Sequence, residues 1–188
     1  MSSNDGITDS SSAANSLLSK AREYTSGKFG VIPVNYEKRP ALHKGEINCK
    51  RGRVASSEEL VQYFGSCNDN TRTVGIGLLL DKSEFTIDTD GRGELVFQNR
   101  VASKLLPNLQ SKINSTMCTK TPHGYHRTFR YKAANDDGVI RTRTYWSLEG
   151  GHNEIAVKGK DHYSIEYCPG YQEIRGIKYL IALSNDET

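Results

Sequence analysis

Residues 84–90 read EFTIDTD, and this stretch decides the fold that we expect for the chain. Phe85 and Ile87 alternate with polar residues, which is the pattern of a β-strand buried on one face. In such a strand Asp88 and Asp90 point to the same face, with their α-carbons about 6.5–7 Å apart. Two carboxylates this close can bind a divalent cation, and Mg²⁺ prefers such oxygen ligands together with phosphate oxygens. A competing explanation is that an Asp-Gly turn simply ends the strand here.

On the N-terminal side of this strand the sequence predicts further helices and strands. The expected elements are a helix that starts after Ser12 and stops at Gly27, a strand over 29–34, a short helix from the capping box at Ser56 to Gly65, and a strand over 73–80. The last of these and residues 84–90 flank a polar tripeptide, so we expect them to pair as a hairpin. Residues 1–12, rich in Ser, Asn, Asp and Gly, are expected to form a flexible tail.

On the C-terminal side a long helix is expected first, with one apolar face and a break at Pro107. That face consists of Val96, Phe97, Val101, Leu105 and Leu106. Five segments with strand composition follow: TMCTK (116–120), YHRTFRY (125–131), VIRTRTYW (139–146), NEIAV (153–157) and HYSIEY (162–167). Short connections favour antiparallel neighbours, so we expect an α+β fold, a largely antiparallel sheet covered on one side by helices.

Length and composition indicate a soluble globular protein with one core. The chain has 188 residues, of which 36% are hydrophobic and 25% charged. No apolar run approaches the roughly 20 residues that cross a bilayer, which argues against a membrane protein. The N-terminus does not resemble a secretory signal, so an intracellular location is expected, with reduced cysteines. Cys118, His123 and His126 could share a metal, but a fourth ligand is missing and other roles for these residues are favoured.

The net charge is only +3, but the basic residues are concentrated in two stretches, 36–53 and 120–132. The first has six basic residues against two acids, and the second has four basic residues and no acid. Such stretches suit phosphate groups of a nucleic acid, although many charge runs are only solvated surface. The residues predicted to bind nucleic acid are Lys38, Arg39, Lys50, Arg51, Arg53 and Arg130.

Two further motifs suit a triphosphate. The segment TPHGYHR at 121–127 is a Gly-containing turn that leads His126 and Arg127 into a strand, where they could donate hydrogen bonds to phosphate. An isolated histidine in a β-strand more often has a structural role. Glu154 would add a third carboxylate on a neighbouring strand, and Asp161 is the alternative third acid. The basic residues that follow Glu154 and could bind phosphates are Lys158, Lys160 and His162.

The order of these parts resembles the bifunctional primase-polymerase (prim-pol) domains of the archaeo-eukaryotic primase superfamily. The resemblance rests on AREYTSGKFGVIPV (21–34), KRP (38–40), SSEEL (56–60), TVGIGLLL (73–80), FTIDTDG (85–91), TPHGYHRTF (121–129) and EIAVKG (154–159). It implies one prim-pol catalytic domain over residues 13–188, a primase-type (RRM-like) palm with an N-terminal αβ subdomain. In that arrangement the N-terminal half, 13–80, packs on the catalytic half, 81–183.

The same resemblance implies a function. Asp88, Asp90 and Glu154 would bind catalytic Mg²⁺ or Mn²⁺, and His126 would contact the incoming nucleotide. The chain would act in DNA replication as a nucleotidyltransferase, a DNA primase or DNA polymerase, that joins nucleoside triphosphates on a single-stranded DNA template. A helicase domain or subunit would be a partner, since the sequence has no G-x-x-x-x-G-K-[ST] motif, and the location would be the cytoplasm, the nucleoid or a replicon.

Other classes of function remain as alternatives. The first is a catalytically inactive module of the same fold that binds single-stranded nucleic acid or nucleotides. A nucleotide-sugar glycosyltransferase also uses an Asp-x-Asp pair, but that pair usually follows βαβ units, which are not predicted before Asp88. A nuclease with a Glu-x-Lys motif is disfavoured, because three residues separate Glu154 from Lys158.

Overall fold

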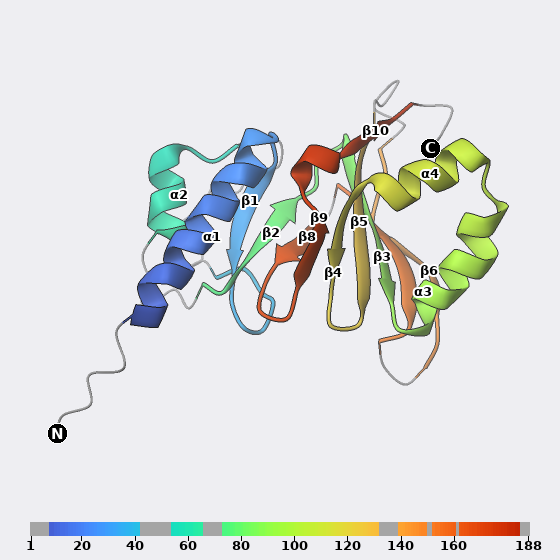
Figure 1. Ribbon diagram of the computed structural model, residues 1–188, viewed down its shortest axis with the longest axis horizontal. Coiled ribbons are helices and arrows are strands. Elements are labelled where there is room, and N and C mark those ends of the chain that lie inside the picture. The colour runs from blue at the N-terminus through green and yellow to red at the C-terminus, as the bar shows by residue number, and fades with distance from the viewer. Residues whose placement is uncertain are drawn as a thin grey trace.

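The computed structural model of the chain is an α+β fold with two β-sheets, which lie side by side in Figure 1. The structure describes residues 8–41, 54–65, 73–131, 139–149, 152–160 and 162–184. All strand pairs in these ranges are antiparallel, apart from one parallel pair at the end of the chain. The predicted fold class, α+β with largely antiparallel sheets, is therefore confirmed.

The smaller sheet combines strands from both ends of the sequence. Its order is β1 (Gly30–Val34), β2 (Gly75–Leu79) and β8 (Tyr163–Tyr167). Helices α1 (Thr8–Ser26) and α2 (Ser57–Phe64) pack on it through a buried apolar cluster. The predicted capping box begins α2, because the Ser56 side chain accepts from the Glu59 N–H and the Glu59 carboxylate accepts from the Ser56 N–H.

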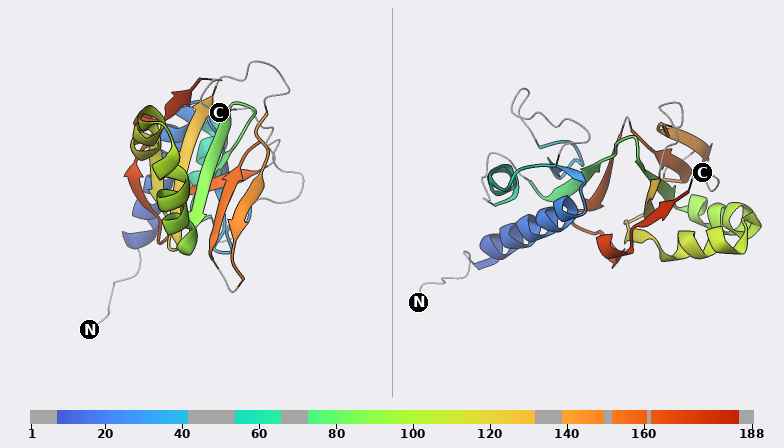
Figure 2. Two further views of the ribbon diagram at one scale, coloured as in Figure 1. Left: turned by 90° about the vertical axis from the view of Figure 1, so that its right-hand side faces the viewer. Right: turned by 90° about the horizontal axis from the view of Figure 1, so that it is seen from above.

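The larger sheet has seven strands. Along it lie β6 (Arg143–Ser147), β7 (Glu154–Lys158), β3 (Glu84–Asp90), β5 (Gly124–Tyr131), β4 (Met117–Lys120) and β9 (Gln172–Arg175), and β10 (Ile181–Leu183) pairs in parallel with β5. Helices α3 (Arg92–Val96) and α4 (Pro107–Ser115) lie along one side of it, as Figure 2 shows. Strands β9 and β10 were not predicted, because they are very short and have no clear alternation.

The predicted hairpin of residues 73–80 and 84–90 is wrong, because β2 and β3 belong to different sheets. Each strand has two other neighbours: β2 pairs with β1 and β8, and β3 pairs with β5 and β7. A turn redirects the chain between them, with the Glu84 N–H donating to the Asp81 carbonyl at 3.1 Å. The turn signal was correct, but it does not say whether the next strand stays in the same sheet.

The long helix expected after β3 is also interrupted earlier than predicted. A π-helical turn (Phe97–Val101) and a 3₁₀ turn (Ala102–Lys104) follow α3, and Pro107 begins α4 instead of ending a helix. Leu106 has extended backbone, as residues before proline usually do, and it is 68% exposed rather than on the buried face. At the other end of the sequence, α1 begins at Thr8, inside the predicted flexible tail, while residues 1–7 lie outside the described residues.

The buried apolar residues form three clusters instead of the single core that we expected. Two of them lie on either side of the smaller sheet, and the third lies between the larger sheet and α3–α4. A layer of buried polar side chains separates these clusters where the two sheets meet: Asp88, His126, Thr128, Ser164 and Glu166. No helix in the described ranges is long and apolar enough to cross a membrane.

Candidate functional site

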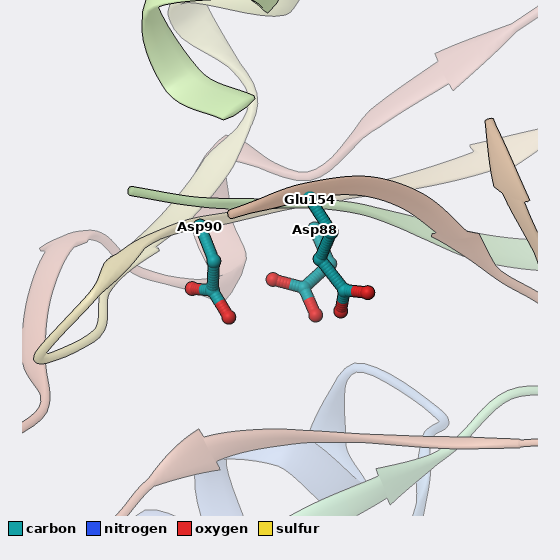
Figure 3. A group of neighbouring side chains, drawn as sticks. All are labelled: Asp88, Asp90 and Glu154. Atoms are coloured by element: carbon teal, nitrogen blue, oxygen red, sulfur yellow. The ribbon is translucent and has the colours of Figure 1, made fainter. Parts of the chain in front are cut away.

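Three carboxylates meet on the face of the larger sheet that is turned toward the smaller one. The register of β3 and β7 places Asp90 directly opposite Glu154, and Asp88 lies two residues before Asp90 on the same face. Ligand oxygens of the three side chains lie within 4.8 Å of one another. Figure 3 shows that all three side chains project to the same side of their strands. The structure therefore brings together the three acids that the sequence analysis selected.

Two cationic side chains flank Asp88. His126 is its direct partner on β5, with Nε2 at 3.2 Å from Oδ1, and Lys158 on β7 places Nζ at 2.5 Å from Oδ2. Burial of Asp88 opposes ionisation, but its interactions with His126 and Lys158 outweigh this and hold the pKa of the carboxyl well below its usual range. Asp88 is therefore a stable anion at neutral pH.

Glu154 has the opposite environment. Partial burial and the negative charges of Asp88 and Asp90 raise the pKa of its carboxyl. The two cations are paired with Asp88, whereas Glu154 and Asp90 face each other across the strand pair. The site thus has an excess of negative charge that a bound cation would relieve.

The structure also supplies a test of whether a metal fits. Oδ1 of Asp88 is buried and has no hydrogen-bond partner among the described residues, since its contact with His126 is an ion pair without hydrogen-bond alignment. A buried carboxylate oxygen normally has a partner, so this atom is available as a ligand. With only carboxylate oxygens as donors, Asp88, Asp90 and Glu154 suit Mg²⁺ or Mn²⁺ rather than a softer metal.

His126 is held from behind by the smaller sheet. Its Nδ1 lies 2.9 Å from the carbonyl oxygen of Ile165 and 3.5 Å from Oε1 of Glu166. A carbonyl and a carboxylate can only accept hydrogen bonds, so Nδ1 carries hydrogen, and the Asp88 carboxylate 3.2 Å from Nε2 favours a proton there as well. Burial lowers the pKa of His126, but its contacts with Asp88 and Glu166 outweigh this and raise it to about 9. The ring is therefore a buried imidazolium that links the two sheets.

Glu166 is the site residue that the sequence analysis missed. It is fully buried on β8, and its Oε1 accepts from the Ser164 hydroxyl at 2.7 Å. Burial opposes its ionisation, but its interaction with His126 dominates and lowers the pKa of the carboxyl. The signal was present in YSIEY, because strand alternation puts Ser164 and Glu166 on one face.

The structure places two of the residues predicted to bind ligands in contacts within the protein. Arg127, predicted to bind nucleotide, lies on the opposite face of β5 from His126, where its guanidinium donates to both Glu94 oxygens at 2.6 and 2.9 Å. Adjacent strand residues point to opposite faces, so both could not reach one site. Arg130, predicted to bind nucleic acid, donates instead to the Gly27 carbonyl at 3.0 Å and to Glu84 at 3.2 Å. It therefore joins the two halves of the molecule.

The other predicted basic residues lie in different places. Lys38 stands over the ring of Tyr171 close to His126, whereas Arg39 is exposed and lies 3.6 Å from Glu37. Lys160 and His162 lie in the connection from β7 to β8. The predicted residues outside the described part of the chain are Lys50, Arg51, Arg53 and Asp161.

Cys118 is a buried free thiol whose partner across the strands is Arg127, so it lies on the face opposite His126 and does not share a metal with it.

Comparison with known proteins adds no family to this picture. No protein-family model matches the sequence, and no curated protein matches it. The function is therefore argued from the geometry of the site.

Proposed function

We propose that the chain is a metal-dependent nucleotidyltransferase of the prim-pol type, a DNA primase or DNA polymerase that joins nucleoside triphosphates on a single-stranded DNA template. The observation that carries the proposal is the cluster of three carboxylates within 4.8 Å, flanked on the same face by His126 and Lys158. An antiparallel sheet with helices on its reverse face, joined to an N-terminal αβ unit, is also what a primase-type palm requires. The order of sequence motifs supports the same class of enzyme.

The acids would hold the metal and the two cations would hold the substrate. Bound by Asp88, Asp90 and Glu154, Mg²⁺ or Mn²⁺ would lower the pKa of an attacking 3′-hydroxyl and neutralise phosphate charge. The imidazolium of His126, fixed by Ile165 and Glu166, presents positive charge at the edge of the acidic cluster. Fixed charges of this kind stabilise the negative charge that develops during phosphoryl transfer.

The proposed partners are a single-stranded DNA template, nucleoside triphosphates and a helicase domain or subunit, within the cell at a replicating DNA molecule. The experiment is a primer-extension and primer-free synthesis assay on single-stranded DNA with Mg²⁺ or Mn²⁺ and with ribo- or deoxyribonucleotides. We expect incorporation that requires a divalent cation and is lost in Asp90→Asn. Asp81→Asn is the matched control, because Asp81 lies before the opposite end of β3, roughly 20 Å or more away by strand rise.

Metal-independent binding of oligonucleotides, without incorporation under any of these conditions, would contradict the proposal. That result would favour a catalytically inactive module that binds single-stranded nucleic acid.

A further inference from the structure

The turn that follows β1 holds Lys38 in an unusual backbone conformation. Its φ angle is +61°, in the left-handed region that side chains other than Gly and Asn rarely adopt. Asn35 stabilises the turn, since its side-chain oxygen accepts from the N–H groups of Glu37 and Arg39 at 3.0 Å each. The Lys38 N–H donates to the Asn35 carbonyl at 2.9 Å. Strained residues that persist in this way cluster at functional sites.

A series of contacts connects this lysine to the acidic cluster. The Tyr163 hydroxyl donates to the Lys38 carbonyl at 3.0 Å, which ties the turn to β8. The Lys38 Nζ lies 5.2 Å from the centre of the Tyr171 ring, and that ring meets His126 edge-on with centroids 6.0 Å apart. His126 in turn contacts Asp88. Lys38 therefore stands on the small-sheet side of the site that carries the carboxylates.

The charge balance of the site indicates a role for the positive charge of Lys38. Within the described residues, the pairing of His126 and Lys158 with Asp88 leaves the charges of Asp90 and Glu154 for a metal ion. A nucleoside triphosphate adds strong negative charge, and phosphate groups are commonly bound by lysine as a point charge. Lys38 supplies positive charge from the opposite side, on a turn whose conformation is already fixed.

We infer that Lys38 binds the phosphate groups of the incoming nucleoside triphosphate, and not the backbone of the template strand. This inference rests on the proposed function. The inference gives different roles to two adjacent residues of the basic segment 36–53. The Arg39 side chain is 77% exposed to solvent, whereas the Lys38 side chain lies over the ring of Tyr171. Adjacent basic residues thus serve different surfaces.

Lys38→Asn in the full chain tests this, because asparagine tolerates the left-handed conformation and removes the ammonium group together with most of the methylene chain. The measurements are equilibrium binding of a non-hydrolysable nucleoside triphosphate with Mg²⁺ and of a single-stranded oligonucleotide. Lys38→Asn should weaken triphosphate binding about 10–100-fold, as expected for loss of one charged contact, with oligonucleotide binding changed less than about 2-fold. Arg39→Asn, the matched control, should leave triphosphate binding unchanged. Lys38→Arg, which keeps the positive charge, should retain most of the wild-type triphosphate binding.

The outcomes separate this inference from the proposed function. If the wild-type chain binds the triphosphate and Lys38→Asn binds it equally well, the role of Lys38 is refuted and the proposed function stands. A selective loss of oligonucleotide binding in Lys38→Asn would also refute it and assign Lys38 to the template. If the wild-type chain fails to bind the triphosphate with metal, the proposed function fails and this inference fails with it. Thermal unfolding of each variant checks that the fold is retained.

Discussion

His126 and Arg127 are neighbours on β5, yet their side chains lie on opposite faces of the larger sheet and in different surroundings. On the reverse face Arg127 makes two hydrogen bonds to Glu94 and lies between the rings of Phe97 and Tyr125, about equally close to both. On the site face His126 contacts Asp88, next to Asp90 and Glu154, for which the described part of the chain shows no ion pair, and the nearby negative charges raise the pKa of Glu154.

The difference shows that the two faces of one sheet treat buried charge differently. On the reverse face the buried arginine and its carboxylate satisfy each other, so the pair holds α3 to the sheet. On the site face a buried oxygen of Asp88 has no hydrogen bond among the described residues, and the negative charges of Asp88, Asp90 and Glu154 lie close together. Groups that fail to satisfy each other are available for a ligand.

Arg127→Met should produce the largest change in stability. It leaves Glu94 with a partly buried, unpaired charge, and breaking a buried pair in this way lowers the free energy of unfolding by about 3–5 kcal/mol. Urea denaturation measures the change. Arg143→Met is the control, because Arg143 is exposed on β6, and it should change stability by less than about 0.5 kcal/mol. Unchanged stability with lost nucleotide binding would instead place Arg127 in the site.

Asp88→Asn should produce the largest change in activity. Incorporation should fall by about 10³-fold, the upper range for loss of one electrostatic stabilising group. Stability should fall as well, because the pKa of Asp88 is lowered in the folded protein and its charge offsets those of His126 and Lys158. Steady-state incorporation and urea denaturation measure the two effects. Wild-type incorporation in this variant would remove Asp88 from the catalytic machinery.

His126→Asn should raise the KM for nucleotide about 10-fold or more, because it removes a fixed positive charge beside the acidic cluster, with template binding retained. It should also change the pH dependence of stability. The pKa of His126 is raised from about 6.5 unfolded to about 9 folded, so its proton stabilises the fold fully below pH 6.5 and ceases to do so as pH rises through 9.

Denaturation of wild type and His126→Asn at several pH values checks this. The difference in unfolding free energy between the two should shrink from pH 6.5 to above 9. A difference that grows over this range would mean that His126 is neutral in the folded protein, and the comparison of the two faces would need revision.

Glu154→Gln should give the smallest change in stability, with the opposite sign. Its folded pKa is raised, so ionised Glu154 destabilises the fold, and the variant should be more stable at pH 7 by a few tenths to about 1 kcal/mol, a screened value for a partly exposed group. The gain should disappear on acidification, as the wild-type carboxyl becomes protonated. Exposed Glu149→Gln is the control. A loss of stability in Glu154→Gln would show that the negative charge of Glu154 is stabilised by a positive partner in the folded protein.

Local patterns predicted much of this arrangement. Period-two alternation placed Asp88 and Asp90 on one face, and the register of β3 with β7 brings Glu154, predicted on a neighbouring strand, to the same place. The same rule, applied to His126 and Arg127, would have separated them. Sheet membership was not predictable from the turn between β2 and β3, because it depends on partners distant in the sequence. Glu166 was missed for the same reason, since its contact with His126 spans two sheets.

The position of β8 in the smaller sheet has a consequence for how the protein is made. Strand β2 ends at Leu79, and its second neighbour begins 84 residues later at Tyr163. At translation rates of about 5–20 residues per second, this interval lasts roughly 4–17 s. Until then the N-terminal sheet has an open edge, and His126 lacks the carbonyl of Ile165 behind it. Asp88 and Asp90 are thus synthesised well before the strand that completes their surroundings, so the carboxylate cluster is one of the last parts of the nascent chain to form.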